Sequence, residues 1–334
     1  MDVGTFCAQS HVIVVAGKGG VGKTTMSAAL AKMAAGAGKS VLIVELEGKS
    51  GITAAFGRPG DLGYEEVLLA PPITDGPAGP DGVGGPTGAI RARRLTPDDA
   101  LVEYLEDHGL KRVSKRLAHS GILDVVSTAI PGIRDVLVLG KVKQLERDGI
   151  ADLILVDAPA TGHAITFLTS ASGLVSAARG GPLRTQAQDV VELLNDPARC
   201  RVILVTLPEE LPVSETIESA YTLEDAAGVQ LGPVIVNACD PEPVGLEHPV
   251  TEVAEAAGLT LAPAHLAALE EARDFRLARH AVSAEQIQRL RRDLPLPHLL
   301  VPALEADAIG PAQTQELAAA LAEAVEALVP EGAS

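Results

Sequence analysis

Short runs of apolar, mostly β-branched residues recur along the chain and alternate with segments of helical character. Uninterrupted runs of this kind are typical of strands that are buried on both faces of a parallel sheet. The clearest lie at residues 12–16, 41–44, 153–156, 202–205 and 234–236, with a further strand expected around 299–301. This alternation predicts an α/β fold with a mostly parallel, doubly wound sheet.

The alternation is broken in two places. Residues 71–88 are rich in Pro and Gly and predict a flexible loop, at the tip of a hairpin formed by 64–69 and 89–95. Residues 96–149 predict a helical insertion, which opens on the capping sequence Thr96-Pro97-Asp98-Asp99 and contains an apolar helix at 133–145. Residues 1–95 and 150–334 then form the sheet domain, with later helices expected at 263–279, 283–292 and 312–328.

A phosphate-binding loop follows the first predicted strand directly. Its pattern, G-x-x-x-x-G-K-[ST], lets backbone N–H groups surround the α- and β-phosphates, while the lysine reaches the β- and γ-phosphates and the hydroxyl can bind Mg²⁺. The helix that begins there presents its positive end to the anion. The sequence therefore predicts a nucleotide triphosphatase whose ATP contacts come from Gly17, Lys18, Gly19, Gly20, Val21, Gly22, Lys23, Thr24 and the adjacent Thr25.

Two other Gly-Lys-Ser triplets, at 38–40 and 48–50, lack the first glycine of this pattern. Gly38 is instead expected to end the first helix in a left-handed conformation.

Charge and cysteine content narrow the possible partners. The 334 residues carry 27 Lys and Arg against 44 Asp and Glu, a formal charge of −17, which offers no general attraction to nucleic acid or anionic lipid. The N-terminus has no secretion-signal pattern, and no uncharged stretch reaches the ~20 apolar residues that span a bilayer. We therefore expect a soluble, cytoplasmic protein. Its scattered Cys7, Cys200 and Cys239 form no C-x-x-C motif, and we expect them to be reduced and mostly structural.

A second chemical element follows the strand at 153–156. Asp157 would lie at the carboxyl end of that strand, where ligands of open α/β sheets gather, and could hold Mg²⁺ directly or through water. The alternative is a carboxylate that caps a turn. The segment Asp157-Ala158-Pro159-Ala160-Thr161-Gly162-His163 suits a backbone that senses the γ-phosphate, and His163 is expected to be structural rather than catalytic.

Together these motifs resemble the arsenite-pump and tail-anchored-protein-targeting ATPase family. The phosphate loop has a second lysine at Lys18, and residues 157–163 resemble the family motif D-T-A-P-T-G-H. The family resemblance also rests on the segments at 207–216, 130–135 and 234–237, and covers nearly the whole chain. The sequence is most similar to the actinobacterial branch of anion-transporting ATPases with a single nucleotide site.

The resemblance implies three roles, with ATP and Mg²⁺ as cofactors. Lys18 would reach the nucleotide of a dimer partner, which is a second copy or a paralogous subunit, and Asn237 would recognise adenine. A carboxylate in the first switch would position the attacking water, and here Glu47 stands where the family has Asp. Glu45 is an alternative that could still lie within the strand. Each residue also has a structural alternative. Lys18 could be a solvated loop lysine, Asn237 a turn former at the strand end, and Glu47 part of a solvated acidic turn.

Departures from the family leave several functions open. Scattered cysteines make an arsenite site of three thiolates unexpected, and the only methionines, Met1, Met26 and Met33, lie outside the insertion. The leading hypothesis is an ATP-driven dimeric switch that couples to a helical client or transport partner. The alternatives are a partition or site-selection ATPase of the MinD/ParA type and a weakly hydrolysing subunit that pairs with an active paralogue.

The apolar residues of the insertion allow two interpretations. They could form a surface that accepts a hydrophobic helical client, or they could pack the insertion's own core. The residues concerned are Ile122, Leu123, Val125, Val126, Ile130, Ile133, Val136, Leu137, Leu139 and Val142.

Overall fold

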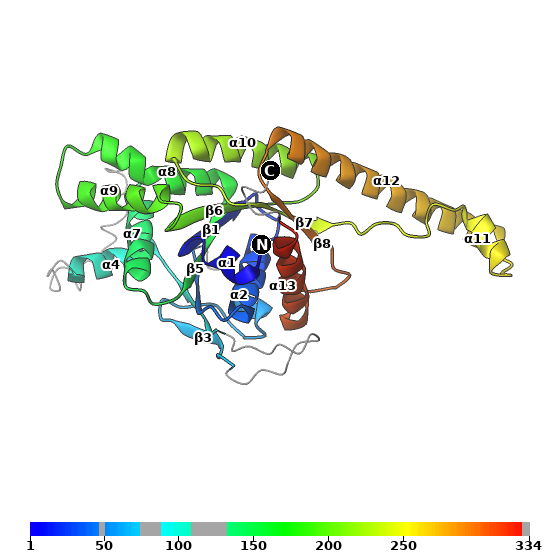
Figure 1. Ribbon diagram of the computed structural model, residues 1–334, viewed down its shortest axis with the longest axis horizontal. Helices are drawn as coiled ribbons and strands as arrows, with labels where there is room; N and C mark the ends of the chain where they lie inside the picture. Colours follow the sequence, from blue (N-terminus) through cyan, green and yellow to red (C-terminus); the bar gives the residue numbers. More distant parts are fainter. Residues whose placement is uncertain (47–50, 74–87, 108–131, 329–334) are drawn as a thin grey trace.

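A single twisted sheet runs through the centre of the molecule (Figure 1). The computed structural model describes residues 1–46, 51–73, 88–107 and 132–328. Within these ranges the sheet has eight strands in the order β3-β4-β2-β5-β1-β6-β7-β8. The strands are β1 (Val12–Gly17), β2 (Val41–Glu45), β3 (Val67–Ala70), β4 (Ile90–Arg94), β5 (Leu153–Ala160), β6 (Cys200–Thr206), β7 (Val234–Cys239) and β8 (His298–Pro302).

All neighbouring strands pair in parallel except the edge strand β3, which is antiparallel to β4. The mostly parallel α/β fold predicted from the sequence is therefore confirmed. The predicted hairpin is present as β3 and β4, and residues 74–87 of its tip lie outside the described ranges.

Helices cover both faces of the sheet (Figure 1). One face is covered by α1 (Val3–Cys7), α2 (Lys23–Gly36), α3 (Gly51–Ala55) and α13 (Pro311–Glu326). The other face is covered by α7 (Ile133–Arg147), α8 (Thr161–Ala177), α9 (Pro182–Asn195) and α10 (Glu210–Ala227). Outside these layers, α4 (Pro97–Asp107) packs on α7, and α11 (Val250–Ala256) lies against the long α12 (Pro263–Asp293).

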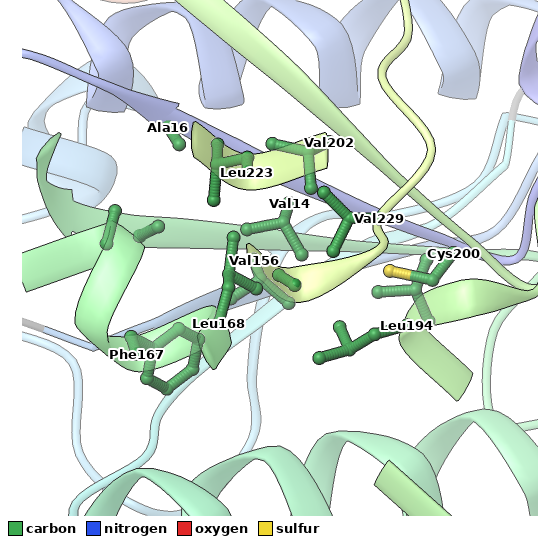
Figure 2. Close-up of a cluster of buried hydrophobic side chains, with 14 of the residues drawn as sticks. Val14, Ala16, Val156, Phe167, Leu168, Leu194, Cys200, Val202, Leu223 and Val229 are labelled. Atoms are coloured by element: carbon green, nitrogen blue, oxygen red, sulfur yellow. The ribbon is translucent and has the colours of Figure 1, made fainter. Parts of the chain in front are cut away.

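The side chains of the central strand β1 alternate between two apolar cores. Val12, Val14 and Ala16 point toward the layer of α7–α10, and Figure 2 shows Val14 and Ala16 among residues of that core. Ile13 and Val15 point to the opposite core, on the side of α2 and α13. Because successive strand residues face opposite sides, a fully apolar strand fills both cores at once.

The apolar residues of α7 belong to the chain's own core in this structure. Ile133, Val136, Leu137, Leu139 and Val142 are all buried, three of them in the large core under the sheet. Leu137 and Val142 are not accessible in this structure, which agrees with the interpretation that they pack the chain's own core. The client surface, which is expected to be exposed in the ATP-bound dimer, stays a prediction. The apolar positions at Ile122, Leu123, Val125, Val126 and Ile130 lie outside the described residues.

Local signals in the sequence mark the ends of helices well. Thr96 caps α4 by accepting a hydrogen bond from the backbone N–H of Asp99 at 3.2 Å. Gly38 follows α2 with a φ of +82°, the left-handed conformation predicted for it. By contrast, the two helices expected at 263–279 and 283–292 form one continuous helix, since residues 280–282 contain neither Pro nor Gly to break it. No helix in the described ranges is both long enough and apolar enough to cross a membrane.

Candidate functional site

The phosphate loop leaves the carboxyl end of β1, the strand that lies between β5 and β6. Gly17 and Gly22 have φ values of +154° and +91°, which strongly favour glycine. A Cβ on Gly17 would lie 2.2 Å from the backbone oxygen of Val205 on the neighbouring strand. The glycines of the motif are thus required both by the backbone turn and by the close approach of β6.

Lys23 begins α2 and folds back over the loop. Its Nζ donates a hydrogen bond to the backbone oxygen of Lys18 at 3.1 Å. The ammonium group therefore lies over the loop, near the positive N-terminal end of the helix, where an anion is attracted from both sources.

Asp157 is joined to the first turn of α2 by two hydroxyl groups. Thr24 Oγ1 donates to Asp157 Oδ2 at 2.7 Å, and Ser27 Oγ donates to Asp157 Oδ1 at 3.0 Å. The carboxylate belongs to β5 and is only 7% exposed. A hydroxyl and a carboxylate are hard oxygen donors that suit Mg²⁺, so the predicted metal ligands Thr24 and Asp157 are chemically matched and adjacent.

The second lysine of the loop is paired within its own chain. Lys18 Nζ lies 2.7 Å from Glu215 Oε1 on α10, and about a third of each side chain is exposed. The structure thus places Lys18 on the side of the loop that faces α10, whereas Lys23 turns back over the loop. Glu215 was not singled out by the sequence, because it lies 197 residues away from Lys18 along the chain.

Asn237 supports the phosphate loop from the end of β7. Its Nδ2 donates to the backbone oxygen of Val21 at 2.9 Å, and its Oδ1 accepts the N–H of Ala238. Ala238 has a φ of +55°, an unusual conformation for a residue with a Cβ. The amide is therefore more than a turn former, since it joins the strand end to the loop that would hold the phosphates.

A cavity of about 360 Å³ opens next to this strand end. It is bounded by residues that follow β7 and β8, by the first turns of α13 and by one residue of α12. They are Asp240, Pro241, Arg276, Ala303, Leu304, Glu305, Ala306, Gln313 and Glu316.

The region after β2, where the carboxylate of the first switch is expected, is described only in part. Glu47 lies outside the described residues, so its predicted role is neither supported nor contradicted by the geometry. Glu45 is the last residue of β2, only 2% exposed and level with Asp157 on the neighbouring strand. Its carboxylate lies 3.5 Å from the guanidinium of Arg94. Glu45 is therefore enclosed in the sheet, in agreement with the expectation that it still belongs to the strand.

The segment 157–163, whose backbone is expected to sense the γ-phosphate and which we call the second switch, begins where β5 meets the phosphate loop. Ala160 at the end of β5 pairs with Gly17, and α8 starts at the next residue. His163 lies exposed in the first turn of α8. Burial raises the pKa of the Asp135 carboxyl group on α7, and the nearby His163 and Arg134 oppose that rise. The structural role expected of His163 stays a prediction.

The three cysteines lie in different parts of the fold. Cys7 packs in the core on the α2 side, and Cys200 packs in the core on the opposite face of the sheet. Burial raises the pKa of their thiols to about 11 and about 12, and that of Cys239 to about 11. Thiols of this kind stay protonated at neutral pH. The described residues contain no group of three or more His, Cys, Asp or Glu side chains that could hold a metal ion.

Comparison with known proteins gives one family and several relatives. The chain matches the family described as CobQ/CobB/MinD/ParA nucleotide binding domain over residues 12–294. It is 36% identical over 233 residues to ATPase BagA of Mycobacterium tuberculosis, a match that covers 67% of this chain and 64% of that protein.

Two further relatives are more distant. An arsenical pump-driving ATPase of Escherichia coli is 28% identical over 232 residues, which is 68% of this chain and 34% of that protein. ATPase get3 of Schizosaccharomyces japonicus is 30% identical over 184 residues, which is 52% of this chain and 50% of that protein. The matched region therefore spans less than two thirds of the length of each of these relatives.

Proposed function

Because this chain belongs to the CobQ/CobB/MinD/ParA nucleotide-binding family, as a P-loop ATPase with ArsA-like relatives, we propose that it is an ATP-hydrolysing dimeric switch. The observation that carries the proposal is the hydrogen bond by which Thr24 joins the phosphate loop to Asp157. The second lysine of the loop, Lys18, points away from this site to Glu215. One copy of the chain would thus supply the phosphate contacts, while Lys18 is paired with Glu215 and would be available to a second site.

ATP binding is assigned to the loop and to Lys23. Backbone N–H groups of residues 17–25 would surround the phosphates, and the Lys23 ammonium would neutralise the β- and γ-phosphates. Thr24 and Asp157 would hold Mg²⁺, which when bound withdraws charge from the phosphate oxygens. Ser27 orients Asp157 by occupying its second oxygen.

Adenine recognition is assigned to Asn237. Its amide already contacts the loop backbone at Val21, and a cavity of about 360 Å³ that begins at Asp240, three residues further along the chain, offers room for a base. Amide groups have both a donor and an acceptor, which suits the edge of adenine. Asn237 would have to exchange one of its present partners for the base.

Lys18 is proposed to cross to the nucleotide of a second subunit, which is another copy or a paralogue. In the free chain its ammonium is occupied by Glu215. About a third of each side chain in this pair is exposed, and ion pairs open to solvent contribute only ~0.2–1 kcal/mol, so a triphosphate in a closed dimer interface would compete well for this lysine. Glu47 would position the attacking water in the same closed site.

The output of the switch is proposed to be a helical partner or a hydrophobic client. Residues 157–163 lead directly into α8, which packs on α7 and α9. A shift of the backbone at the γ-phosphate would therefore be passed to this helical layer. A membrane-targeting role of the MinD type is disfavoured by α13, whose apolar side chains Leu317, Leu321 and Val325 are buried against the sheet domain.

Loss of Lys23 tests the nucleotide site. We expect Lys23→Ala to abolish ATP binding measured by isothermal titration calorimetry, because the loop then keeps only neutral backbone donors and Lys18, which is paired with Glu215. Phosphate release by the wild-type protein, alone and with a paralogous subunit, measures turnover in the same preparations. Unchanged ATP affinity in a folded Lys23→Ala variant would remove the basis of the proposal.

A further inference from the structure

The helix α12 extends far beyond the sheet. Its 31 residues correspond to a length of roughly 46 Å, and its only buried residues, Gln286 and Leu290, lie near its C-terminal end. Figure 1 shows the N-terminal part of α12 projecting from the body, with α11 at its far end. We call this projecting part, residues 263–282, the arm.

An apolar groove lies at the root of the arm. Its volume is about 370 Å³, and its apolar lining combines the ends of β6 and β7 with one face of α12, namely Leu207, Pro208, Ala238, Phe275, Ala278 and Val282. Phe275 and Val282 remain 64% and 52% exposed. Phe275 is one of only four Phe residues in the chain, so this exposure of an aromatic ring is unusual here.

The groove lies at the carboxyl ends of the strands, as the phosphate loop does. Leu207 directly follows β6, the strand that pairs with β1 up to Gly17. Lys18 contacts Glu215 on α10, the helix that begins just after the groove residue Glu209. The groove and Lys18 thus both lie at the carboxyl ends of the central strands, near the first turns of α10.

The two sides of the groove have opposite charges. Glu209 lies on the side of α10, where Glu210 follows it, and Arg279 lies on the side of α12. Arg279 Nε is 2.9 Å from Asp240 Oδ2, and Arg276 is 3.8 Å from the same buried carboxylate, which fixes the arm to the end of β7. About half of the Arg279 side chain stays exposed and can face a partner.

We propose that this groove is the interface with a second copy of the chain, with Phe275 as its central apolar anchor. In a two-fold dimer the same patch occurs on both subunits, so an acidic side and a basic side around an apolar centre complement each other after rotation. Aromatic anchors at the centre of an interface carry much of the binding energy. This inference rests on the proposed dimeric switch and specifies where its subunits meet.

Substitution of Phe275 tests the anchor. We expect Phe275→Asp to weaken dimer formation at least tenfold, measured by light scattering with Mg²⁺ and a slowly hydrolysed ATP analogue, while ATP binding by calorimetry stays unchanged. The matched control is Leu259→Asp, because Leu259 is equally exposed, at 60%, but lies in the loop between α11 and α12. That control should dimerise as the wild type does.

A charge exchange tests the two-fold arrangement. Glu209→Arg and Arg279→Glu should each weaken the homodimer, because each places like charges opposite one another. A mixture of the two variants should restore a heterodimer, since both contacts then join opposite charges. Restoration in the mixture supports the interface, and weakened association that persists in the mixture contradicts it.

The outcomes separate this inference from the proposed function. Dimerisation of Phe275→Asp at the wild-type affinity, together with its loss in Lys18→Ala, would overturn the interface and leave the switch intact. A wild-type protein that stays monomeric with Mg²⁺ and the ATP analogue would overturn both. Wild-type dimerisation of Phe275→Asp with loss of binding to a different protein would assign the groove to that protein and also overturn the inference.

Discussion

At the scale of single residues, Glu215 forms an ion pair with Lys18, the side chain on which the proposed dimer depends. If Lys18 must leave Glu215 to reach a partner's nucleotide, Glu215→Gln should favour closure. We expect the variant to dimerise at up to about fivefold lower concentration of ATP analogue, since an ion pair open to solvent contributes ~0.2–1 kcal/mol. Light scattering across an ATP-analogue titration measures this shift.

The control for Glu215→Gln is Glu218→Gln, which changes an exposed carboxylate on the same helix. It should leave the titration unchanged. If Glu215→Gln instead impairs dimerisation as Lys18→Ala does, then Glu215 presents the lysine to the partner rather than restraining it.

Glu47 and Glu45 illustrate how neighbouring carboxylates differ in their expected roles. Glu47→Gln should keep ATP binding and lower single-turnover hydrolysis by roughly 100-fold or more, because a water-positioning group acts mainly in the transition state. Glu45→Gln changes a buried partner of Arg94 and should chiefly lower the unfolding temperature. Wild-type hydrolysis by Glu47→Gln would contradict the assignment of the first switch.

The chemistry of single residues was more predictable from the sequence than their partners. The phosphate loop and Asp157 follow from local motifs, and the structure brings Thr24 and Asp157 together as expected. Ser27, Glu215 and the contact from Asn237 to Val21 could not be found in this way, because each depends on packing between segments distant in sequence.

At the scale of elements, the close approach of β2 and β4 depends on Gly88. A Cβ at this position would lie 1.8 Å from the backbone oxygen of Lys39, just before β2. Gly88→Ala should therefore displace the strand ends and destabilise the fold by ~1–3 kcal/mol, the range of overpacking changes. Thermal unfolding followed by circular dichroism measures the effect.

Gly173→Ala provides the comparison for Gly88→Ala, since Gly173 lies within α8 and a Cβ there would meet no atom within 4 Å. In a helix this substitution should stabilise by ~0.5–1 kcal/mol. Equal unfolding temperatures for the two variants would contradict the steric argument.

Element types were predictable where the apolar period or the capping residues were local. The strands and the Thr96 cap are confirmed because each signal lies within a few residues. The continuity of α12 was missed, although residues 280–282 hold no Pro or Gly that would break the helix. The burial of Leu137 was left open, because it depends on which neighbouring helices cover α7.

At the scale of the whole molecule, His298 should make stability depend on pH. Burial lowers its pKa to about 4, from about 6.5 in the unfolded chain. The unfolded state therefore binds a proton first, so stability is complete above pH 6.5 and falls as the pH drops toward 4. The loss is at most about 1.4 kcal/mol for each pH unit in this window.

We expect His298→Gln to flatten the unfolding temperature between pH 6.5 and 4.5 compared with the wild type. The Arg199–Glu146 pair acts in a lower window, because Arg199 lowers the pKa of Glu146 and its stabilisation is lost only as the carboxylate protonates. Both proteins should therefore lose stability alike below pH 4.5. Parallel curves above that pH would contradict the role of His298.

The sheet order also determines when the nucleotide site can exist. Thr24, in the helix that follows β1, is hydrogen-bonded to Asp157 of the neighbouring strand β5, but the two residues are 133 positions apart in the chain. At ~5–20 residues per second, the ribosome needs roughly 7–27 s to synthesise this interval. During that time the phosphate loop is already made, but the carboxylate that joins it has not been synthesised. A nascent chain that ends before β5 therefore lacks Asp157, the proposed Mg²⁺ ligand, and we expect ATP with Mg²⁺ to assist only the later stages of folding.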